Sequence, residues 1–191
     1  VMPDRIEAGS LLCMVAVTGG KVKLNNVLAD NIIPVINKLE ESGCRIEKQK
    51  NGIYLEAPKK LKALDIKTMP YPGFPTDMQS VFASMLTVAK GTSVIVENIF
   101  ESRYKYMSEL MKMGAKITIE GKTAVIKGVR KLYGAKVEST DLRGGAALVT
   151  AGLAAKGRTV VTNIEYILRG YEKLDEKWRK LGAKITVKEG E

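Results

Sequence analysis

Histidine is absent from this sequence of 191 residues. An imidazole base, a serine or cysteine nucleophile paired with histidine, and nearly every catalytic zinc site are therefore excluded. Cysteine is scarce too, with Cys13 in an apolar stretch and Cys44 in a turn-like Ser-Gly-Cys sequence. Two such cysteines provide neither a disulfide framework nor a metal site, as is typical of a cytosolic protein. Any acid or base in this chain must be aspartate, glutamate, lysine or tyrosine.

Long apolar runs are also missing. No run approaches the roughly 18 residues of a membrane span, and the first residues lack the charged and apolar regions of a signal peptide. We therefore expect a soluble, cytoplasmic chain with no membrane partner. Positive charge is in excess, with 31 Lys and Arg against 21 Asp and Glu and a net charge of +10. This excess favours an anionic partner, whether nucleic acid, acidic lipid or a phosphorylated metabolite, and does not distinguish among them.

Three stretches of the sequence resemble one another, which indicates a repeated supersecondary unit. Each contains an apolar strand with an asparagine, then an amphipathic stretch that ends at a glycine. The matching positions are Asn26, Asn98 and Asn163, and Gly43, Gly114 and Gly182. The glycines are 71 and 68 residues apart, so the period is about 70 residues. We expect units at about 1–60, 61–130 and 131–191.

The middle unit has the pattern βαβαββ. Alternating apolar residues predict strands, apolar residues at helical spacing predict helices, and Glu-Gly-Lys at 120–122 predicts a hairpin turn. The predicted strands cover 64–68, 94–96, 116–119 and 123–127, and the predicted helices cover 78–89 and 104–113.

The outer units are each one strand short of this pattern. The first begins directly in a helix over 6–17, and the third begins with a strand over 135–139 and stops after a strand over 184–188. Either a segment elsewhere in a longer polypeptide completes the domain, or the terminal repeats are simply irregular.

Thr76 and Asp77 follow a proline-rich turn at the expected start of the helix over 78–89. Such residues commonly cap a helix. A carboxylate held on a rigid turn is also well suited to act as a general base. Both interpretations of Asp77 stay open on the pattern.

Arg143 lies in the first turn of an expected helix after Asp141, where the helix dipole disfavours a cation. An anion over the helix start would explain this placement, with Gly144 and Gly145 allowing close approach. Alternatively, Arg143 is solvated and reaches back to Asp141.

Arg103 and Arg169 stand near the expected starts of the second helices of the middle and last units. Repeats bring equivalent helix ends together around a local axis. We therefore expect several of these arginines to face one cavity.

Five motifs, taken in order, resemble the family of UDP-N-acetylglucosamine enolpyruvyltransferases. They are PDRIEAG (3–9), PYPGFPTDMQ (70–79), IFESRY (99–104), TDLRGGAALV (140–149) and LRGYEKLDEKWRKLGAKI (168–185). The resemblance covers essentially the whole chain. It implies an α/β fold in which residues 1–191 form one lobe of a two-lobed inverse α/β barrel, made of three βαβαββ units with helices inside and sheets outside. It also implies that a short N-terminal segment of the polypeptide completes this lobe and that the other, missing lobe is its partner.

The same resemblance implies a reaction. The family transfers enolpyruvyl from phosphoenolpyruvate to the 3-hydroxyl of UDP-N-acetylglucosamine and releases phosphate. The reaction passes through a tetrahedral ketal and is the first committed step of peptidoglycan synthesis in the cytoplasm. The resemblance implies no metal, no cofactor, and no nucleic-acid or membrane partner. Because the family's ligands lie between two lobes, we expect the isolated lobe to be inactive.

Residue roles follow from the resemblance by motif match. Asp77 matches the family's aspartate at the sugar 3-hydroxyl and is the candidate catalytic base. Arg143 and Arg169 match arginines that hold the carboxylate and phosphate of phosphoenolpyruvate. The positions that match sugar-nucleotide contacts are Asp77, Ile99, Phe100 and Arg103.

The sequence departs from the family at Ser102 and over 166–168, where Tyr-Ile-Leu replaces a common His-Ile-Asp run. A 5-enolpyruvylshikimate-3-phosphate synthase-like transferase is an alternative with the same architecture, and the PTDM and RGYE contexts argue against it. A noncatalytic RNA-binding βαβαββ module would also explain the repeats and the charge of +10. Only 6% aromatic residues, without a stacking cluster, argue against that alternative.

Overall fold

The computed structural model describes residues 3–188. Its α-helices are α1 (Arg5–Thr18), α2 (Ile33–Glu41), α3 (Thr76–Leu86), α4 (Lys105–Lys112), α5 (Leu142–Ala154), α6 (Glu165–Leu168) and α7 (Leu174–Lys180), with a short 3-10 helix η1 (Ala29–Ile32). Its strands are β1 (Lys21–Asn25), β2 (Arg45–Gln49), β3 (Gly52–Glu56), β4 (Ile66–Lys67), β5 (Thr92–Val96), β6 (Lys116–Glu120), β7 (Thr123–Lys127), β8 (Lys136–Glu138) and β9 (Val160–Thr162).

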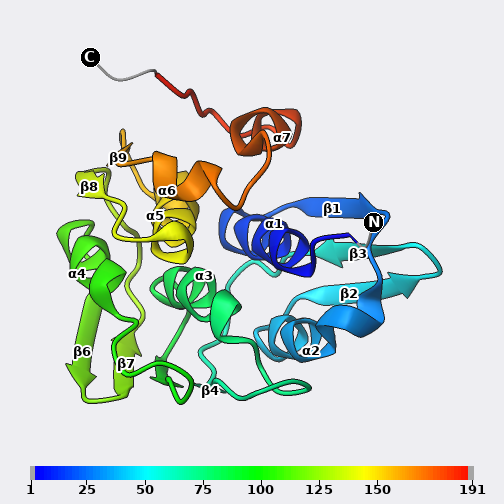
Figure 1. Ribbon diagram of the computed structural model, residues 1–191, viewed down its shortest axis with the longest axis horizontal. Helices are drawn as coiled ribbons and strands as arrows, with labels where there is room; N and C mark the ends of the chain where they lie inside the picture. The colour runs from blue at the N-terminus through cyan, green and yellow to red at the C-terminus, as the bar shows by residue number, and fades with distance from the viewer. Residues whose placement is uncertain (1–2, 189–191) are drawn as a thin grey trace.

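The strands form three sheets that surround the central helices (Figure 1). The first sheet has the antiparallel order β1-β3-β2. The second has the order β4-β5-β7-β6, in which the β4–β5 pair is parallel and the other pairs are antiparallel. The third is the parallel pair β8-β9. None of the helices in the described residues has both the length and the hydropathy to cross a membrane.

Helix α3 lies at the centre and packs against α1 and α5. Every residue from Met78 to Leu86 is buried, so this helix reaches solvent only at its first turn. Its two serines are satisfied within the core, because Ser80 Oγ donates to the Arg143 carbonyl at 2.9 Å and Ser84 Oγ donates to the Ala147 carbonyl at 2.7 Å. The expected arrangement, with helices inside and sheets outside, is confirmed.

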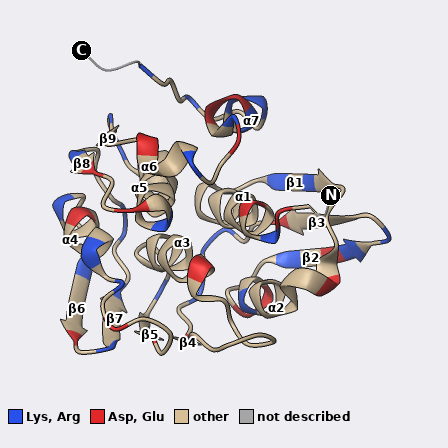
Figure 2. Cartoon of the chain, viewed as in Figure 1, with Lys and Arg blue, Asp and Glu red and all other residues tan. Residues whose placement is uncertain are grey.

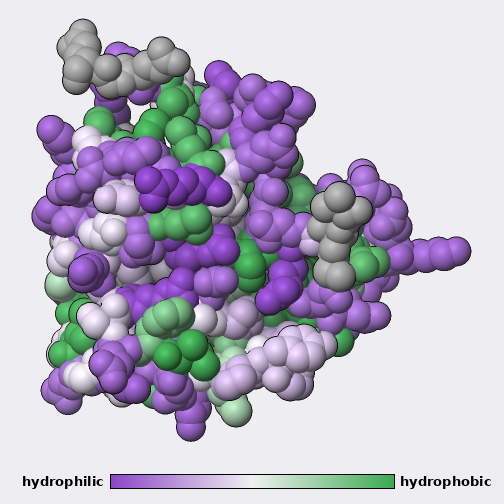
Figure 3. All heavy atoms as spheres, viewed as in Figure 1, coloured by the Kyte–Doolittle hydropathy of each residue, from purple (hydrophilic) through white to green (hydrophobic). Residues whose placement is uncertain are grey.

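Charged residues are concentrated on the strands and outer helices, while most of α3 and α5 carries none (Figure 2). Hydrophilic side chains accordingly cover most of the face shown in Figure 3, with smaller hydrophobic patches between them. The separation is the one expected when apolar burial stabilises the fold.

The hairpin and helix predictions for the middle of the chain hold closely. Strands β6 and β7 and the turn between them lie where the pattern predicts them.

The expected helix over 78–89 begins earlier, at Thr76, with Pro75 as the N-cap residue. The capping interpretation of Thr76 and Asp77 is therefore wrong, because both residues lie inside the helix and no side-chain cap bond forms. The expected strand over 64–68 is reduced to Ile66–Lys67.

The strand registers correct the repeat alignment by one residue in the middle unit. Asn26 N donates to the Asn51 carbonyl just beyond the β1–β3 pairing, and Glu97 N donates to the Lys122 carbonyl just beyond the β5–β7 pairing. The equivalent of Asn26 is therefore Glu97 and not Asn98. The parallel pairs agree, because β9 is followed by Asn163 in the place where β5 is followed by Glu97.

The expected strand over 184–188 is absent from the described residues. In the second sheet, β6 is held only by β7, which lies between β6 and β5. Within residues 3–188, no segment takes the corresponding place beside β9. Residues 184–188 therefore have no ladder to join, and their alternating sequence does not become a strand.

Candidate active site

Asp77 lies in the first turn of α3, after the turn over 70–75 that contains a cis Tyr71–Pro72 bond. Two arginines from distant parts of the chain form ion pairs with its carboxylate. Arg103 Nη2 donates to Oδ1 at 2.8 Å, and Arg143 Nη2 lies 3.5 Å from Oδ2. The Asp77 side chain remains 40% exposed, so a ligand has access to it.

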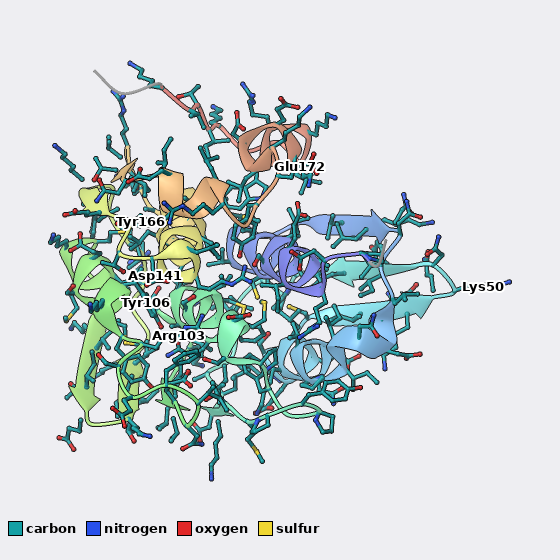
Figure 4. The ribbon with its side chains drawn as sticks, in the orientation of Figure 1. Lys50, Arg103, Tyr106, Asp141, Tyr166 and Glu172 are labelled. Atoms are coloured by element: carbon teal, nitrogen blue, oxygen red, sulfur yellow. The ribbon has the colours of Figure 1, made fainter. Side chains whose placement is uncertain are left out.

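Arg103 stands in the loop between β5 and α4 and uses both ends of its guanidinium fork. Nη1 donates to Thr76 Oγ1 at 2.7 Å while Nη2 holds Asp77, and its carbon Cζ lies 4.7 Å from the centroid of the Phe100 ring. Figure 4 shows Arg103 with Tyr106 and Asp141 where the ends of α3, α4 and α5 meet. This arginine therefore joins the helix start to the loop.

Arg143 is not the solvated residue of the alternative interpretation. Its side chain is 16% exposed and contacts Asp77, while its backbone amide donates to Asp141. The Arg143 Cζ atom lies 5.7 Å from the centroid of the Tyr171 ring. The Nη1 atom is buried without a hydrogen-bond partner among the described residues. A buried guanidinium N–H without a partner is costly, so this atom is well placed to receive an anionic oxygen.

The start of α5 does not admit an anion in the expected way. Asp141 Oδ1 accepts the amides of Arg143 at 3.0 Å and Gly144 at 2.8 Å, so it already caps the helix. Protein atoms fill the space beside both glycines. A Cβ atom at Gly145 would lie 2.5 Å from Ile167 Cγ1, and one at Gly144 would lie 2.9 Å from Tyr106 Cβ. These glycines serve helix packing, and the anion-binding group at this helix start is the Arg143 side chain.

Arg169 lies elsewhere than expected. It follows the short helix α6 as its C-cap residue, and the next helix begins only at Leu174. Its side chain is exposed and its Cζ atom lies 5.6 Å from the centroid of the Tyr166 ring. Among residues 3–188, it makes no hydrogen bond or ion pair with Asp77. Its neighbour Tyr171 nevertheless packs on Arg143, so Arg169 lies in the segment that covers this arginine.

Ile99 and Phe100 are exposed at 40% and 49%, as suits ligand-binding residues. Their amides are not free, because both donate to Glu97 Oε1, at 2.9 Å and 3.2 Å. Patterning missed this role of Glu97. The available signal was an acidic residue directly after the apolar strand of 94–96.

Burial makes the tyrosines and cysteines of the interior poor bases near neutral pH. Burial raises the pKa of Tyr104 to about 12, and it also raises the pKa of Tyr106 and Tyr171, so these phenols stay protonated near neutral pH. Burial likewise raises the pKa of Cys13 and Cys44. The thiols are therefore poor nucleophiles, as their sequence context suggests.

The pKa of Asp77 is the net result of opposing effects. Burial raises it, but the hydrogen bond from Arg103 and the charge of Arg143 lower it by more, so the pKa lies below the ordinary 3.8. These contacts stabilise the folded chain above pH 3.8, and that contribution is lost as pH falls through the lowered pKa of the folded state.

We expect the carboxyl carbon of Asp77 to titrate with a midpoint below 3.8 in NMR. Arg143→Met removes a cationic neighbour and shifts this midpoint upward. Arg45→Met is the matched control, since Arg45 pairs with Glu47 on an exposed strand. A midpoint that does not move in Arg143→Met contradicts the electrostatic coupling of the two residues.

The model of the family described as EPSP synthase (3-phosphoshikimate 1-carboxyvinyltransferase) matches residues 1–178. Among curated proteins, UDP-N-acetylglucosamine 1-carboxyvinyltransferase 1 of Caldanaerobacter subterraneus subsp. tengcongensis is 56% identical over 98% of this chain and 45% of its own length. UDP-N-acetylglucosamine 1-carboxyvinyltransferase of Desulfofundulus thermocisternus is 52% identical over 97% of this chain and 76% of its own length. The chain belongs to the EPSP synthase family and, within it, to the UDP-N-acetylglucosamine 1-carboxyvinyltransferases.

Solved structures agree with this family. The enolpyruvyl transferase NikO from Streptomyces tendae is 26% identical and has a TM-score of 0.88 over 96% of this chain and 44% of its own. EPSP synthase from Acinetobacter baumannii, at 19% identity and a TM-score of 0.76, shares the fold. The chain spans about 45% of the first of the curated 1-carboxyvinyltransferases, consistent with one lobe. The names of these relatives favour the sugar-nucleotide interpretation over the shikimate and RNA-binding alternatives.

Proposed function

We propose that the polypeptide containing this chain transfers enolpyruvyl from phosphoenolpyruvate to the 3-hydroxyl of UDP-N-acetylglucosamine and releases phosphate. This is the first committed step of peptidoglycan synthesis, carried out in the cytoplasm. The observation that carries the proposal is the placement of the Asp77 carboxylate between Arg103 and Arg143, with Arg143 Nη1 buried and without a hydrogen-bond partner within residues 3–188. The motif matches around these residues support the substrate assignment.

In this proposal, Asp77 removes the proton of the 3-hydroxyl as the hydroxyl oxygen attacks the central carbon of phosphoenolpyruvate. The C=C π bond breaks and the terminal carbon takes a proton from an acid of the closing lobe, which gives the tetrahedral ketal. Loss of a proton from that carbon then re-forms the double bond as the C–O bond to phosphate breaks. The lowered pKa of Asp77 keeps the carboxylate ionised and also makes it a weak base. The anionic substrate resolves this conflict, because it competes with Asp77 for the guanidinium of Arg143. As Arg143 turns to the substrate, the pKa of Asp77 rises toward the range of a useful base.

The arginines bind the anionic groups. Arg143 and Arg169 hold the carboxylate and phosphate of phosphoenolpyruvate, and fixed cations stabilise the polyanionic ketal that forms after attack. Arg169 is exposed and stacked near Tyr166, so it reaches the substrate by turning from that ring.

The sugar nucleotide is held by four residues: Asp77, Ile99, Phe100 and Arg103. The Ile99 main chain contributes through its carbonyl, because its amide is bonded to Glu97.

Besides the two substrates, this proposal gives the chain a protein partner, the rest of the same polypeptide. A cavity of about 410 Å³ lies between α1, the end of α5 and α7, lined by residues that include Val15, Leu153 and Trp178. It adjoins residues 182–184, next to the segment that lacks a strand partner. A segment from outside residues 3–188 that paired with β9 would fill this side of the fold and extend the third sheet.

The test is phosphate release from phosphoenolpyruvate and UDP-N-acetylglucosamine. We expect turnover by the full-length enzyme, none by this chain alone, and partial recovery when the other lobe is added in trans. Closing two lobes excludes water and brings both sets of charges to one centre, which one lobe cannot do. Turnover by the full-length enzyme with shikimate 3-phosphate but not with UDP-N-acetylglucosamine overturns the substrate assignment.

A further inference from the structure

We infer that Glu97 is a positioning residue that holds the start of α3, with Thr76 and Asp77, against the loop of Ile99 and Phe100. The inference rests on the proposed function, because it takes these two segments to bind the reacting sugar. Glu97 follows β5 and is fully buried, at 0% exposed. It therefore acts through its neighbours and not on the substrate.

Four donors converge on the Glu97 carboxylate. Oε1 accepts from Thr68 Oγ1 at 2.8 Å and from the amides of Ile99 at 2.9 Å and Phe100 at 3.2 Å. Oε2 accepts from Thr76 Oγ1 at 2.8 Å. One side chain thus joins the loop that presents Ile99 and Phe100 to the helix that carries Asp77.

The bond to Thr76 also sets the direction of a hydroxyl. Thr76 gives its single hydrogen to Glu97, so its oxygen is left to accept from Arg103 Nη1 at 2.7 Å. The other end of the Arg103 fork holds Asp77 Oδ1 at 2.8 Å. Glu97 therefore fixes the Asp77 carboxylate through Thr76 and Arg103.

The other two sheets provide an internal comparison. At the positions equivalent to Glu97, Asn26 and Asn163 adopt left-handed backbone conformations, with φ of 58° and 55°. Their side chains form exposed hydrogen bonds, Asn26 with Asn51 and Asn163 with Glu138. The fold is thus built at this point without a buried carboxylate. A glutamate stands there only in the unit that carries Asp77, which indicates that it serves the site.

Replacing Glu97 with glutamine changes the side chain little in size. It keeps the bonds to the loop amides and disturbs the bond to Thr76. The amides of Ile99 and Phe100 can only donate, so they retain the remaining oxygen and leave the new NH2 group facing Thr76. The Thr76 oxygen must then accept from both the glutamine and Arg103, and its own hydrogen loses its partner. The fork of Arg103 loosens, and Asp77 loses its fixed orientation.

In the full-length enzyme, we expect Glu97→Gln to lower kcat about 10- to 100-fold, since small displacements of a reacting group have effects of this size. We also expect the acid limb of the pH profile to move to higher pH, because Arg103 then lowers the pKa of Asp77 less. Glu109→Gln is the matched control. Glu109 is likewise a buried glutamate, at 7% exposed, but it bonds to Lys112 and the Glu138 amide away from the site. It should reduce Tm while leaving kcat and the acid limb unchanged.

Thr76→Val keeps the inference testable if Glu97→Gln does not fold. Removing the hydroxyl interrupts the same link, so it should lower kcat and shift the acid limb in the same direction. Where both single variants fold, the double variant should lose less activity than the product of their separate losses.

The outcomes separate this inference from the proposed function. If Asp77→Asn abolishes turnover while Glu97→Gln and Thr76→Val keep the wild-type kcat and acid limb, the positioning role is overturned and the base assignment stands. If Asp77→Asn turns over like the wild type, Asp77 is not the base and the positioning role falls with that assignment. The proposed function is overturned only if the wild-type full-length enzyme fails to turn over UDP-N-acetylglucosamine.

Discussion

Replacing Asp77 with asparagine is expected to lower kcat of the full-length enzyme about 10²- to 10⁴-fold, the range that a positioned general base contributes. The amide has the shape of the carboxylate and its oxygen still accepts from Arg103, but it cannot take the proton of the 3-hydroxyl. Asparagine also removes the negative charge between Arg103 and Arg143. The KM for phosphoenolpyruvate should therefore stay the same or fall while kcat collapses.

This split between kcat and KM distinguishes lost chemistry from a damaged fold. The matched control is Asp65→Asn, because Asp65 Oδ1 accepts from the Val94 amide on the strand side of the molecule and an asparagine oxygen does the same. Its kcat should equal that of the wild type. Turnover of Asp77→Asn within about threefold of the wild type removes Asp77 from the role of base.

Arg143→Lys and Arg169→Lys should each weaken phosphoenolpyruvate binding by about 1.5–3 kcal/mol, or roughly 10- to 150-fold. A planar guanidinium holds two oxygens of a carboxylate or phosphate at once, and an ammonium does not. For Arg143, the buried Nη1, which has no partner in the described part of the chain, is the donor that the lysine lacks. For Arg169, the lysine also loses the stacking on Tyr166.

Calorimetric titration of the full-length enzyme with phosphoenolpyruvate measures these losses. Arg179→Lys is the control, since Arg179 pairs with Asp175 on the surface of α7 and should leave the affinity unchanged. Affinity that is unchanged in both Arg143→Lys and Arg169→Lys shows that neither side chain holds the substrate.

Local pattern was sufficient where neighbours in sequence are also partners in space. The hairpin of β6 and β7 closes over a two-residue turn at 121–122, and α5 starts after an aspartate that caps its first turn. The absence of histidine restricted the chemistry to carboxylates, lysine and tyrosine before any fold was known. The repeat of about 70 residues indicated the architecture, because each unit builds the same kind of local contacts.

Tertiary structure decided every contact that crosses the units. Asp77 contacts Arg103 and Arg143, which are 26 and 66 residues away, and these partners lower the pKa of a carboxylate that the pattern left open as a helix cap or a base. Residues 184–188 carry a strand pattern yet form no strand, since a strand needs a neighbour that the described residues lack. Glu97 gave only a weak signal in the sequence because its four donors come together only after the end of β4, the start of α3 and the loop after β5 have packed. Periodicity reports which face of an element is buried, whereas the partners of a buried polar group depend on how the elements meet.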